Sequence, residues 1–454
     1  MNSIPVTPLE RWIARRIGLP PTTRPERRVL DVYRLQKLRE TLACLVEKSP
    51  FYRGRLSGSG SPPLRSLADL PSLPFTTPED LRRNPLSFLC ASQSQIARVV
   101  TLRSSGTTGA PKRIFFTEED LELTRDFFRV GMSTLAHPGD RVLVLLPGNA
   151  PSSVGDLLLN ALSRMKTSAW VHGPVSDPEA VRAIIRERDI DALVGIPVQV
   201  LALARSANSF PPGRIKTVLL TTDYVPEAVV EELIRSWGCK VFQHYGMSEM
   251  GYGGGVECGA FSGYHLRDAD LLVEIVDPST GDPLPEGETG EVVFTTLTRR
   301  GMPLLRYRTG DLAALTSVPC PCGSVLQRLT KIRGRIRKPA LSGSGLPFDL
   351  PDLDEAILRV DGVVSYQAEI YSGIHGDHLL LTVFTGNRPD DALLTTVTRA
   401  LMKVRSVTEG VARGNLILDP PVPGCGYGLD AGTTKRQLID HRQRQKDAPH
   451  ENHC

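Results

Sequence analysis

The hydrophobic and polar positions divide the chain into regions of different secondary structure. Apolar residues recur at helical spacing over residues 28–49, and residues 1–80 as a whole are predicted to be helical. Residues 140–245 alternate between helical stretches and short apolar runs that end in small or polar residues. Those runs cover residues 141–148, 168–174, 191–197, 216–222 and 240–246. The alternation predicts a parallel sheet covered by helices, with ligands bound at the carboxyl ends of its strands.

The pattern changes after residue 265. Residues 270–297 contain two strand-like segments around a turn rich in Pro and Gly, which is typical of an antiparallel pair. A break rich in Gly, Arg, Pro and Ser follows near residues 333–345, and the rest alternates helix and strand. We therefore predict an α/β fold. A large N-terminal domain with helix-covered mixed sheets spans residues 1–333, with residues 1–80 as a helical lead-in. A small α+β domain spans residues 334–454 and ends in a disordered tail beyond residue 443.

Composition and charge narrow the function classes. The chain has 454 residues and a formal net charge of +4, which is too slight to favour nucleic acid as a partner. No stretch approaches the roughly 18 apolar residues of a membrane span, and the first residues lack the apolar core of a signal peptide. Eight cysteines in a chain of this length do not indicate a disulfide framework. We expect a cytoplasmic protein without a membrane partner.

The segment "SSGTTGAPK", residues 104–112, is built like a phosphate-binding loop. Gly106 and Gly109 allow positive φ, so successive amides can point at one anion. Hydroxyl donors and one ammonium surround them: Ser104, Ser105, Thr107, Thr108 and Lys112. The P-loop pattern is absent. Taken alone, the segment could equally be a flexible loop.

Three further motifs follow in order. "HYGMSE" ends a predicted parallel strand and offers Glu249 as an oxygen ligand for a divalent cation on a nucleotide. "RYRTGD" supplies Asp311 beside a predicted tight turn, where a carboxylate suits paired ribose hydroxyls. "KIRGR" adds Arg333 and Arg335 just before the domain break. Each alone could be a turn or an ion pair, but all four at these separations indicate a nucleotide site.

With these motifs, the sequence resembles the adenylate-forming (AMP-binding) superfamily of acyl- and aryl-CoA ligases, and within it the phenylacetate–CoA ligase-like branch. The resemblance covers roughly residues 30–445 and rests on "SSGTTGAPK", "YGMSE", residues 263–297 and "PLLRYRTGDL". It implies a large N-terminal domain and a small rotating C-terminal lid. The predicted break near residue 334 matches that division.

The resemblance also implies roles for single residues. The loop from Ser104 to Lys112 covers the phosphates of ATP, and Glu249 binds Mg²⁺ beside Ser248, where the family usually has threonine. Asp311 binds the ribose hydroxyls, joined by Arg333 or Arg335. The adenine is walled by residues of two strand ends: Thr221, Thr222, Asp223, His244, Tyr245 and Gly246, with Met247 in the same nucleotide-binding segment.

Two positions depart from the family pattern. After Gly334 and Arg335 the family usually continues into acidic residues, where this chain has Arg337 and Lys338. The lid lysine usually follows a glycine directly. Here Lys435 is the candidate, one position displaced, and Thr434 takes the family position if "DHR" is the anchor.

The resemblance implies an enzyme, an AMP-forming acid–CoA ligase. It uses ATP to convert a small carboxylic acid, aryl or acyl, to an acyl adenylate and then forms a thioester with coenzyme A. Lys435, Glu249 and Lys112 would be its catalytic residues. Because of the two departures, two alternatives stay open: adenylation with transfer to a carrier protein or another acceptor, and a nucleotide-binding protein without ligase activity. The sequence also leaves a homodimer open and does not identify the acid.

A separate set of residues has metal-ligand spacing. "CPCGS" places Cys320 and Cys322 two positions apart before a glycine, and "VECGAFSGYH" adds Cys258 and His265. Three thiolates and one imidazole form a closed tetrahedral set typical of structural Zn²⁺. The alternative is that Cys258 is a buried apolar side chain and the other two lie in a solvent loop. Some relatives in this branch carry a similar cysteine pattern, which favours zinc.

Overall fold

The computed structural model describes residues 6–56, 64–102, 110–206, 210–336, 348–430 and 435–442. The chain forms two compact units. The first comprises residues 1–171 and 242–336, and the second comprises residues 172–241 and 337–454. The boundary between Ile336 and Arg337 lies close to the expected break. The division expected from the sequence, which assigns residues 172–241 to an N-terminal domain, stays a prediction.

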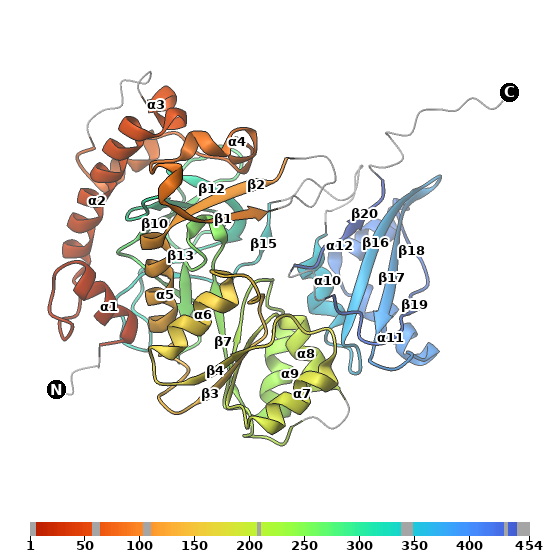
Figure 1. Cartoon of the computed structure of the whole chain (residues 1–454). Helices are drawn as coiled ribbons and strands as arrows, with labels where there is room; N and C mark the ends of the chain where they lie inside the picture. Colours follow the sequence, from red (N-terminus) through yellow and green to blue (C-terminus); the bar gives the residue numbers. More distant parts are fainter. Residues whose placement is uncertain are drawn as a thin grey trace. The chain divides into compact units, whose positions relative to one another are not determined.

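The first unit opens with the predicted helical lead-in, drawn in red and orange in Figure 1. Thr7 caps the first helix through a reciprocal capping box with Glu10. The buried positions of the longest helix fall three or four residues apart, at residues 30, 34, 38, 41 and 45, so one stripe faces the core. The helices of this unit are α1 (Pro8–Arg16), α2 (Arg27–Lys48), α3 (Pro50–Leu56), α4 (Pro78–Arg83), α5 (Glu118–Met132) and α6 (Val154–Ser163), with 3₁₀ turns η1 (Leu67–Ser72), η2 (Pro85–Phe88), η3 (Gln93–Gln95) and η4 (Ser248–Met250).

Strands β1 (Ile96–Leu102) and β2 (Lys112–Thr117) form an antiparallel ribbon whose connection contains the glycine-rich segment. A second antiparallel sheet runs in the order β10 (Leu271–Val276), β11 (Gly290–Thr296), β12 (Tyr307–Ala313) and β15 (Gly334–Arg335). The antiparallel pair predicted for residues 270–297 is therefore confirmed by β10 and β11. Every residue of β11 is buried, so this strand forms part of the core.

The first unit also contains a parallel strand pair and a set of short antiparallel strands. Strands β3 (Arg141–Val144) and β4 (Ser168–Val171) pair in parallel, as predicted. The chain returns to the first unit at Phe242, within β7 (Lys240–Tyr245). Strand β7 pairs antiparallel with β8 (Gly255–Glu257), and β8 pairs antiparallel with β9 (Tyr264–Leu266). Short strands β14 (Arg328–Leu329) and β13 (Leu315–Thr316) continue the antiparallel pairing from β9.

The second unit combines a parallel strand pair with an α+β sheet. Strands β5 (Ala192–Gly195) and β6 (Thr217–Leu220) are parallel, which again confirms the prediction. Helices α7 (Pro178–Glu187), α8 (Pro197–Arg205) and α9 (Glu227–Trp237) accompany them. The hairpin of β16 (Ser365–Gly373) and β17 (Gly376–Phe384) carries parallel partners on both sides: β18 (Leu416–Leu418) and β19 (Val422–Pro423) on β17, and β20 (Ile439–Asp440) on β16. Helices α10 (Leu350–Ile357), α11 (Asp391–Leu401) and α12 (Arg405–Ala412) complete it.

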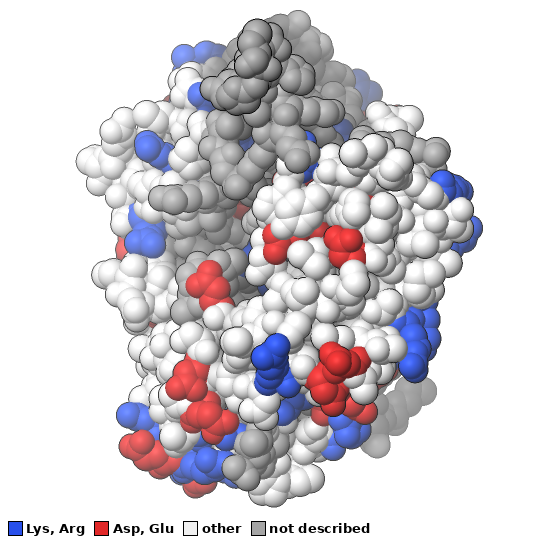
Figure 2. All heavy atoms as spheres, turned by 90° about the vertical axis from the view of Figure 1, so that its right-hand side faces the viewer, with Lys and Arg blue, Asp and Glu red and all other residues white. Residues whose placement is uncertain are grey.

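The structure also shows how charged side chains are distributed (Figure 2) and how long and apolar the helices are. On the face drawn in Figure 2, acidic and basic side chains are interspersed among uncharged ones, so this face does not present one large field of a single sign. Within the described part of the chain, no helix combines the length and the apolar character that crossing a membrane requires.

Candidate active site

Lys112, Glu249 and Tyr307 meet in the first unit. The Lys112 ammonium forms an ion pair with Glu249 Oε1. The Tyr307 hydroxyl lies 3.2 Å from the same oxygen and 3.4 Å from Lys112 Nζ. Burial alone would raise the pKa of Glu249, but the Lys112 ammonium, together with hydrogen bonds from the backbone and from Tyr307, outweighs burial, and the net pKa lies below the ordinary value of a carboxyl group. The ionised Glu249 carboxylate is thus held beside the Lys112 ammonium. The carboxylate is suited to bind a divalent cation, and the ammonium is suited to bind phosphate oxygens.

The turn that carries Glu249 depends on glycine at two positions. A Cβ on Gly246 would lie 1.9 Å from the carbonyl oxygen of Tyr252, so a side chain does not fit there. Gly251 has a φ of +82°, which favours glycine, and it ends the 3₁₀ turn η4. The chain thereby leaves β7 at Tyr245 and turns back with Glu249 at the strand's carboxyl end. The predicted position of Glu249 is the observed one.

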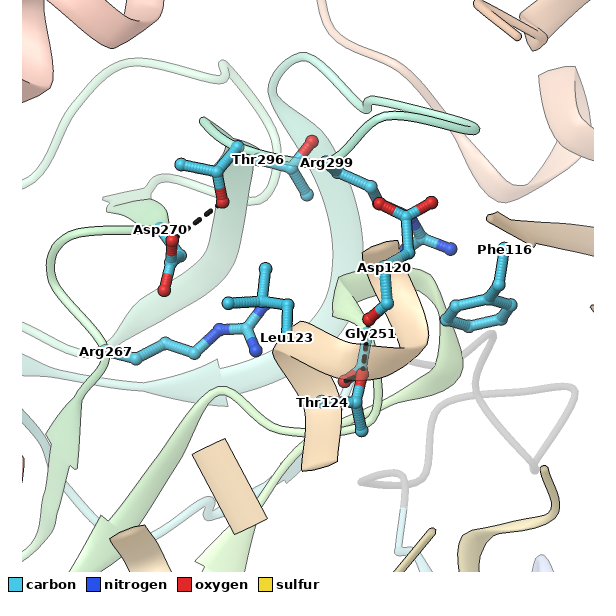
Figure 3. Close-up of a pocket in the computed structure, with 10 residues that line it drawn as sticks. Phe116, Asp120, Leu123, Thr124, Gly251, Arg267, Asp270, Thr296 and Arg299 are labelled. Atoms are coloured by element: carbon cyan, nitrogen blue, oxygen red, sulfur yellow. Dashed lines mark hydrogen bonds between the residues drawn. The ribbon is translucent and has the colours of Figure 1, made fainter. Parts of the chain in front are cut away.

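Buried donors bind the backbone of this turn from behind. Arg299 Nη1 donates to the carbonyl oxygen of Glu249 at 2.5 Å, Arg267 Nη2 to that of Met250 at 3.0 Å, and Thr124 Oγ1 to that of Gly251 at 3.2 Å. Arg267, Arg299 and Thr124 line one small pocket, with Thr124 on helix α5 (Figure 3). Its free volume of about 10 Å³ leaves room for about one water molecule.

Asp311 forms a second cluster of the first unit with Tyr245 and Arg335. The Tyr245 hydroxyl donates to Asp311 Oδ2 at 2.9 Å, and Arg335 Nε lies 2.8 Å from Asp311 Oδ1. Burial and the Asp311 carboxylate raise the pKa of Tyr245 well above its ordinary value, so the phenol keeps its proton. Both candidate arginines are exposed, and of the two Arg335 contacts Asp311, whereas Arg333 donates its backbone N–H to the carbonyl oxygen of Leu312 at 2.8 Å.

The backbone around Asp311 differs from the predicted tight turn. Residues 307–313 form strand β12, and opposite Val292 of β11 the strand carries three residues, Thr309 to Asp311. Gly310 adopts a φ of +76° in this bulge, and its N–H donates to Glu291 Oε1 at 2.9 Å. The turn prediction was wrong because a bulge and a turn both require a glycine at positive φ. The bulge redirects the strand beside Asp311.

His244 lies on β7, before the turn. Burial, with a contribution from Arg267, lowers the pKa of its imidazole to about 4, so the ring is neutral near pH 7. The rings of Phe127 and Phe128 lie 6.4 and 6.3 Å from it. An uncharged ring among apolar rings is consistent with the adenine-facing role that the resemblance implies.

Thr221, Thr222 and Asp223 belong to the second unit and follow β6. Thr222 has a φ of +83°, an uncommon conformation for a β-branched residue and one that occurs disproportionately at functional sites. Asp223 accepts the backbone N–H of Arg436 at 3.2 Å. Ser104 to Gly109 lie outside the described residues, as do Thr434, Arg337 and Lys338.

Lys435 lies in the second unit and is exposed. The side chain of the next residue, Arg436, points into the unit, where its Nη2 lies 2.6 Å from the buried Asp354 carboxylate and its guanidinium lies 5.6 Å from the ring centre of Tyr366. The carboxylates of Asp354 and Asp223 outweigh the effect of burial and raise the pKa of Arg436. Arg436 therefore anchors the segment that carries Lys435.

The four predicted metal ligands come together in the first unit. The ligand atoms of Cys258, His265, Cys320 and Cys322 all lie within 4.8 Å of one another. Tetrahedral zinc, with Zn–S bonds of about 2.3 Å, holds its sulfur ligands about 3.8 Å apart. The sulfurs of Cys258 and Cys320 lie 3.6 Å apart, and the Cys322 sulfur lies 3.5 Å from His265 Nε2. Spacing and donor chemistry both fit zinc.

Two residues at the site were not predicted as functional. Tyr307 stands inside "RYRTGD", and its place four residues before the candidate Asp311 was the available signal. Arg299 stands between Thr298 and Arg300, and the sequence does not indicate that it is buried or which partners it has. Both contact Glu249.

Known proteins resemble this chain in the region that contains the site residues. The family model of AMP-binding enzymes matches residues 98–297, a range that contains Lys112 and Glu249. The phenylacetate–coenzyme A ligase of Thermus thermophilus is 34% identical over 66% of this chain and 69% of its own length. The enzyme of the same name from Escherichia coli is 29% identical over 78% of this chain and 82% of its own.

A solved structure extends the likeness of fold to nearly the whole chain. A 2-hydroxyisobutyryl-CoA ligase in the postadenylation state superposes with a TM-score of 0.74 at 21% identity, over 92% of this chain and 90% of that one. At that identity the match concerns the fold. The sequence relatives supply the rest: this chain belongs to the AMP-binding family of adenylate-forming enzymes, in the branch of the phenylacetate–coenzyme A ligases.

Proposed function

We propose that this chain, an AMP-forming acid–CoA ligase, converts a small carboxylic acid to its acyl adenylate with ATP and then transfers the acyl group to coenzyme A. In the first step a carboxylate oxygen attacks the α-phosphorus of ATP and pyrophosphate leaves. In the second step the thiol of coenzyme A attacks the acyl carbonyl and AMP leaves. Two anions must approach each other in the first step, so groups that balance negative charge carry most of its catalysis.

The pairing of Lys112 with Glu249 carries this proposal. Without nucleotide each neutralises the other inside the protein. When ATP binds, the Lys112 ammonium can turn to phosphate oxygens, and the released Glu249 carboxylate can hold Mg²⁺. Bound there, Mg²⁺ would neutralise charge on the phosphates. The Tyr307 hydroxyl can donate to Glu249 in both states.

The Asp311 cluster supports the nucleotide end of the site. Its carboxylate is suited to accept two neighbouring hydroxyl protons of a ribose, and Arg335 and Tyr245 hold it in one orientation. The glycine-rich segment of residues 104–109, which joins β1 to Lys112 on β2, is proposed as the phosphate loop. Thr221, Thr222, Asp223 and the residues from His244 to Ser248 are proposed to contact the adenine end and the cation.

A second candidate shares the first step and differs in the acceptor. Arg337 and Lys338 stand where the family usually has acidic residues, and Thr434 stands at the family's lysine position if "DHR" is the anchor. These departures favour a carrier protein or another nucleophile, in place of coenzyme A, as the acceptor of the acyl group. Thioester analysis with coenzyme A separates the two candidates.

Pyrophosphate exchange into ATP tests the proposed adenylation. The assay uses the whole chain with Mg²⁺, ATP, labelled pyrophosphate and a panel of carboxylic acids, beginning with phenylacetate because the relatives are named for it. We expect exchange that depends on one class of acid. Nucleotide binding without exchange for every acid in the panel would contradict adenylation.

The cysteine and histidine cluster is proposed as a structural zinc site. Cys258, His265, Cys320 and Cys322 would occupy four positions of a tetrahedral ion, and such closed sites stabilise the fold. Zinc here would fasten the loop between β13 and β14 to the β8–β9 pair.

Replacing one ligand tests the zinc site. Cys320→Ser should lose the zinc and lower the free energy of unfolding by several kcal/mol, because binding energy at a structural site is folding energy. Cys239→Ser, which changes a buried cysteine outside the cluster, should keep the zinc. Metal analysis and thermal unfolding of protein purified without chelators measure both effects. Wild-type protein without zinc would contradict the site.

A further inference from the structure

We propose that Arg299 is a positioning residue for adenylation: its buried guanidinium holds Lys112 and Glu249 at the spacing that Mg²⁺ and ATP require. The inference rests on the proposed function, because it assigns Arg299 to the same site. The Arg299 guanidinium binds backbone carbonyl oxygens, and within the described part of the chain no hydrogen bond or ion pair joins it to the Lys112 ammonium or the Glu249 carboxylate. It acts through the backbones that carry them.

The contacts of Arg299 reach both catalytic segments. Its Nη1 donates to the carbonyl oxygen of Glu249 at 2.5 Å and lies 3.5 Å from that of Ser248. Its Nη2 donates to the carbonyl oxygen of Phe115 at 3.1 Å. Phe115 is three residues beyond Lys112 on the same strand, β2. One guanidinium therefore ties the strand of Lys112 to the turn of Glu249.

The orientation of the guanidinium is fixed. Its carbon lies 4.3 Å from the ring centre of Phe116, so the ring and the guanidinium pack together. Only 8% of Arg299 is exposed. A planar group with donors in a fixed fork can bridge two carbonyl oxygens, whereas a lysine ammonium is a single point on a flexible chain. The two contacts require arginine.

The backbone of the Arg299 loop is itself anchored. Asp120, in the first turn of α5, accepts the N–H groups of Arg300 at 2.7 Å and Gly301 at 2.9 Å. The same carboxylate accepts the N–H of Thr117, at the end of β2, at 3.0 Å. Asp120 of α5 thus fixes the backbone next to Arg299 relative to the end of β2.

Arg267 continues the support along the turn. Its Nη2 binds the carbonyl oxygen of Met250, the residue after Glu249. In Figure 3 the two arginines lie around the same pocket, with Asp120 and Thr124 of α5 among its lining residues. With the carbonyls bound from this side, the Glu249 carboxylate remains available for Lys112 and the cation. A displaced turn would move that carboxylate relative to Lys112.

The same chain supplies a matched control in Arg306. Arg306 is 2% exposed, donates from Nη1 to the carbonyl oxygens of Pro71 and Leu73 at 2.7 Å each, and lies 4.0 Å from the ring centre of Phe75. Like Arg299, it therefore has two carbonyl partners and one ring, and it differs in a further ion pair with Glu274 at 3.0 Å. Its carbonyl partners belong to a segment that carries none of the proposed site residues.

The test compares Arg299→Lys with Arg306→Lys by calorimetric titration with ATP in the presence of Mg²⁺ and no acid, and by pyrophosphate exchange. Both variants should lower the melting temperature. Only Arg299→Lys should weaken Mg·ATP binding and raise the Mg²⁺ concentration for half-maximal exchange, each by about tenfold, the size expected for a lost charge-assisted hydrogen bond. The KM for the acid should be unchanged in both.

Phe116→Leu keeps the arginine and removes the ring that orients it, so it should shift the same two constants in the same direction by a smaller factor. This variant decides the matter if Arg299→Lys does not fold. Mg·ATP binding and Mg²⁺ dependence equal to those of Arg306→Lys, in whichever variant folds, would overturn the positioning role. Wild-type binding of Mg·ATP without exchange for any acid would instead count against the proposed function, because the titration does not depend on the acid.

Discussion

Glu249→Gln is expected to reduce pyrophosphate exchange by about 10²–10³-fold, because it keeps the shape of the side chain and removes the charge that binds the divalent cation. The substitution also leaves the Lys112 ammonium without its ionised partner. Exchange measured over a range of Mg²⁺ concentrations should show a higher half-saturating concentration as well as a lower maximum.

Glu274→Gln is the control for this prediction. Glu274 is a largely buried carboxylate of the same unit, paired with Arg306 at 3.0 Å, so its substitution has a similar structural cost. Exchange in this variant should stay near that of the wild type. A Glu249→Gln protein with unchanged Mg²⁺ dependence would remove Glu249 from the mechanism.

Lys435→Ala is expected to slow adenylation by about 10²-fold, because a cation near the α-phosphate offsets the charge that builds up in the transition state. Thioester formation from a preformed acyl adenylate should be nearly unaffected, since we expect the lid to rotate and carry Lys435 away before that step. The anchoring of Arg436 by Asp354 fixes the backbone beside an exposed Lys435, and the length of a lysine side chain can absorb a shift of one residue.

Lys403→Ala serves as the control, because Lys403 is an exposed lysine of the same unit that has no proposed role. The two half-reactions are measured separately, by pyrophosphate exchange and by thioester release from the synthetic adenylate. Normal exchange in Lys435→Ala would mean that the displaced lysine does not fill the family role.

The sequence predicted the parts of the site that depend on local pattern. Glu249 follows an apolar run that forms β7, so its place at a strand's carboxyl end could be inferred from periodicity. The pairing of "CPC" with Cys258 and His265 could be inferred from donor chemistry, although the register of β9 on β14 is what brings them together.

The support of the site could not be predicted in this way. Arg299 binds carbonyl oxygens of Phe115 and Glu249, which are 184 and 50 residues away in the sequence. Backbone carbonyls look the same at every position, so a single sequence contains no signal for that choice of partners. The bulge at Gly310 was missed for a related reason: it is defined by the pairing of β12 with β11, and β11 lies outside the "RYRTGD" motif.

The central claim, that this chain is an acid–CoA ligase that forms AMP, is tested most directly by product analysis of the wild-type protein. The reaction contains ATP, Mg²⁺, coenzyme A and phenylacetate or another acid that supports exchange, and the products are separated and identified by mass. We predict AMP, pyrophosphate and the acyl-CoA thioester in equal amounts, with no turnover when the acid is left out. Formation of ADP, or of AMP without a thioester at any concentration of coenzyme A, would contradict it.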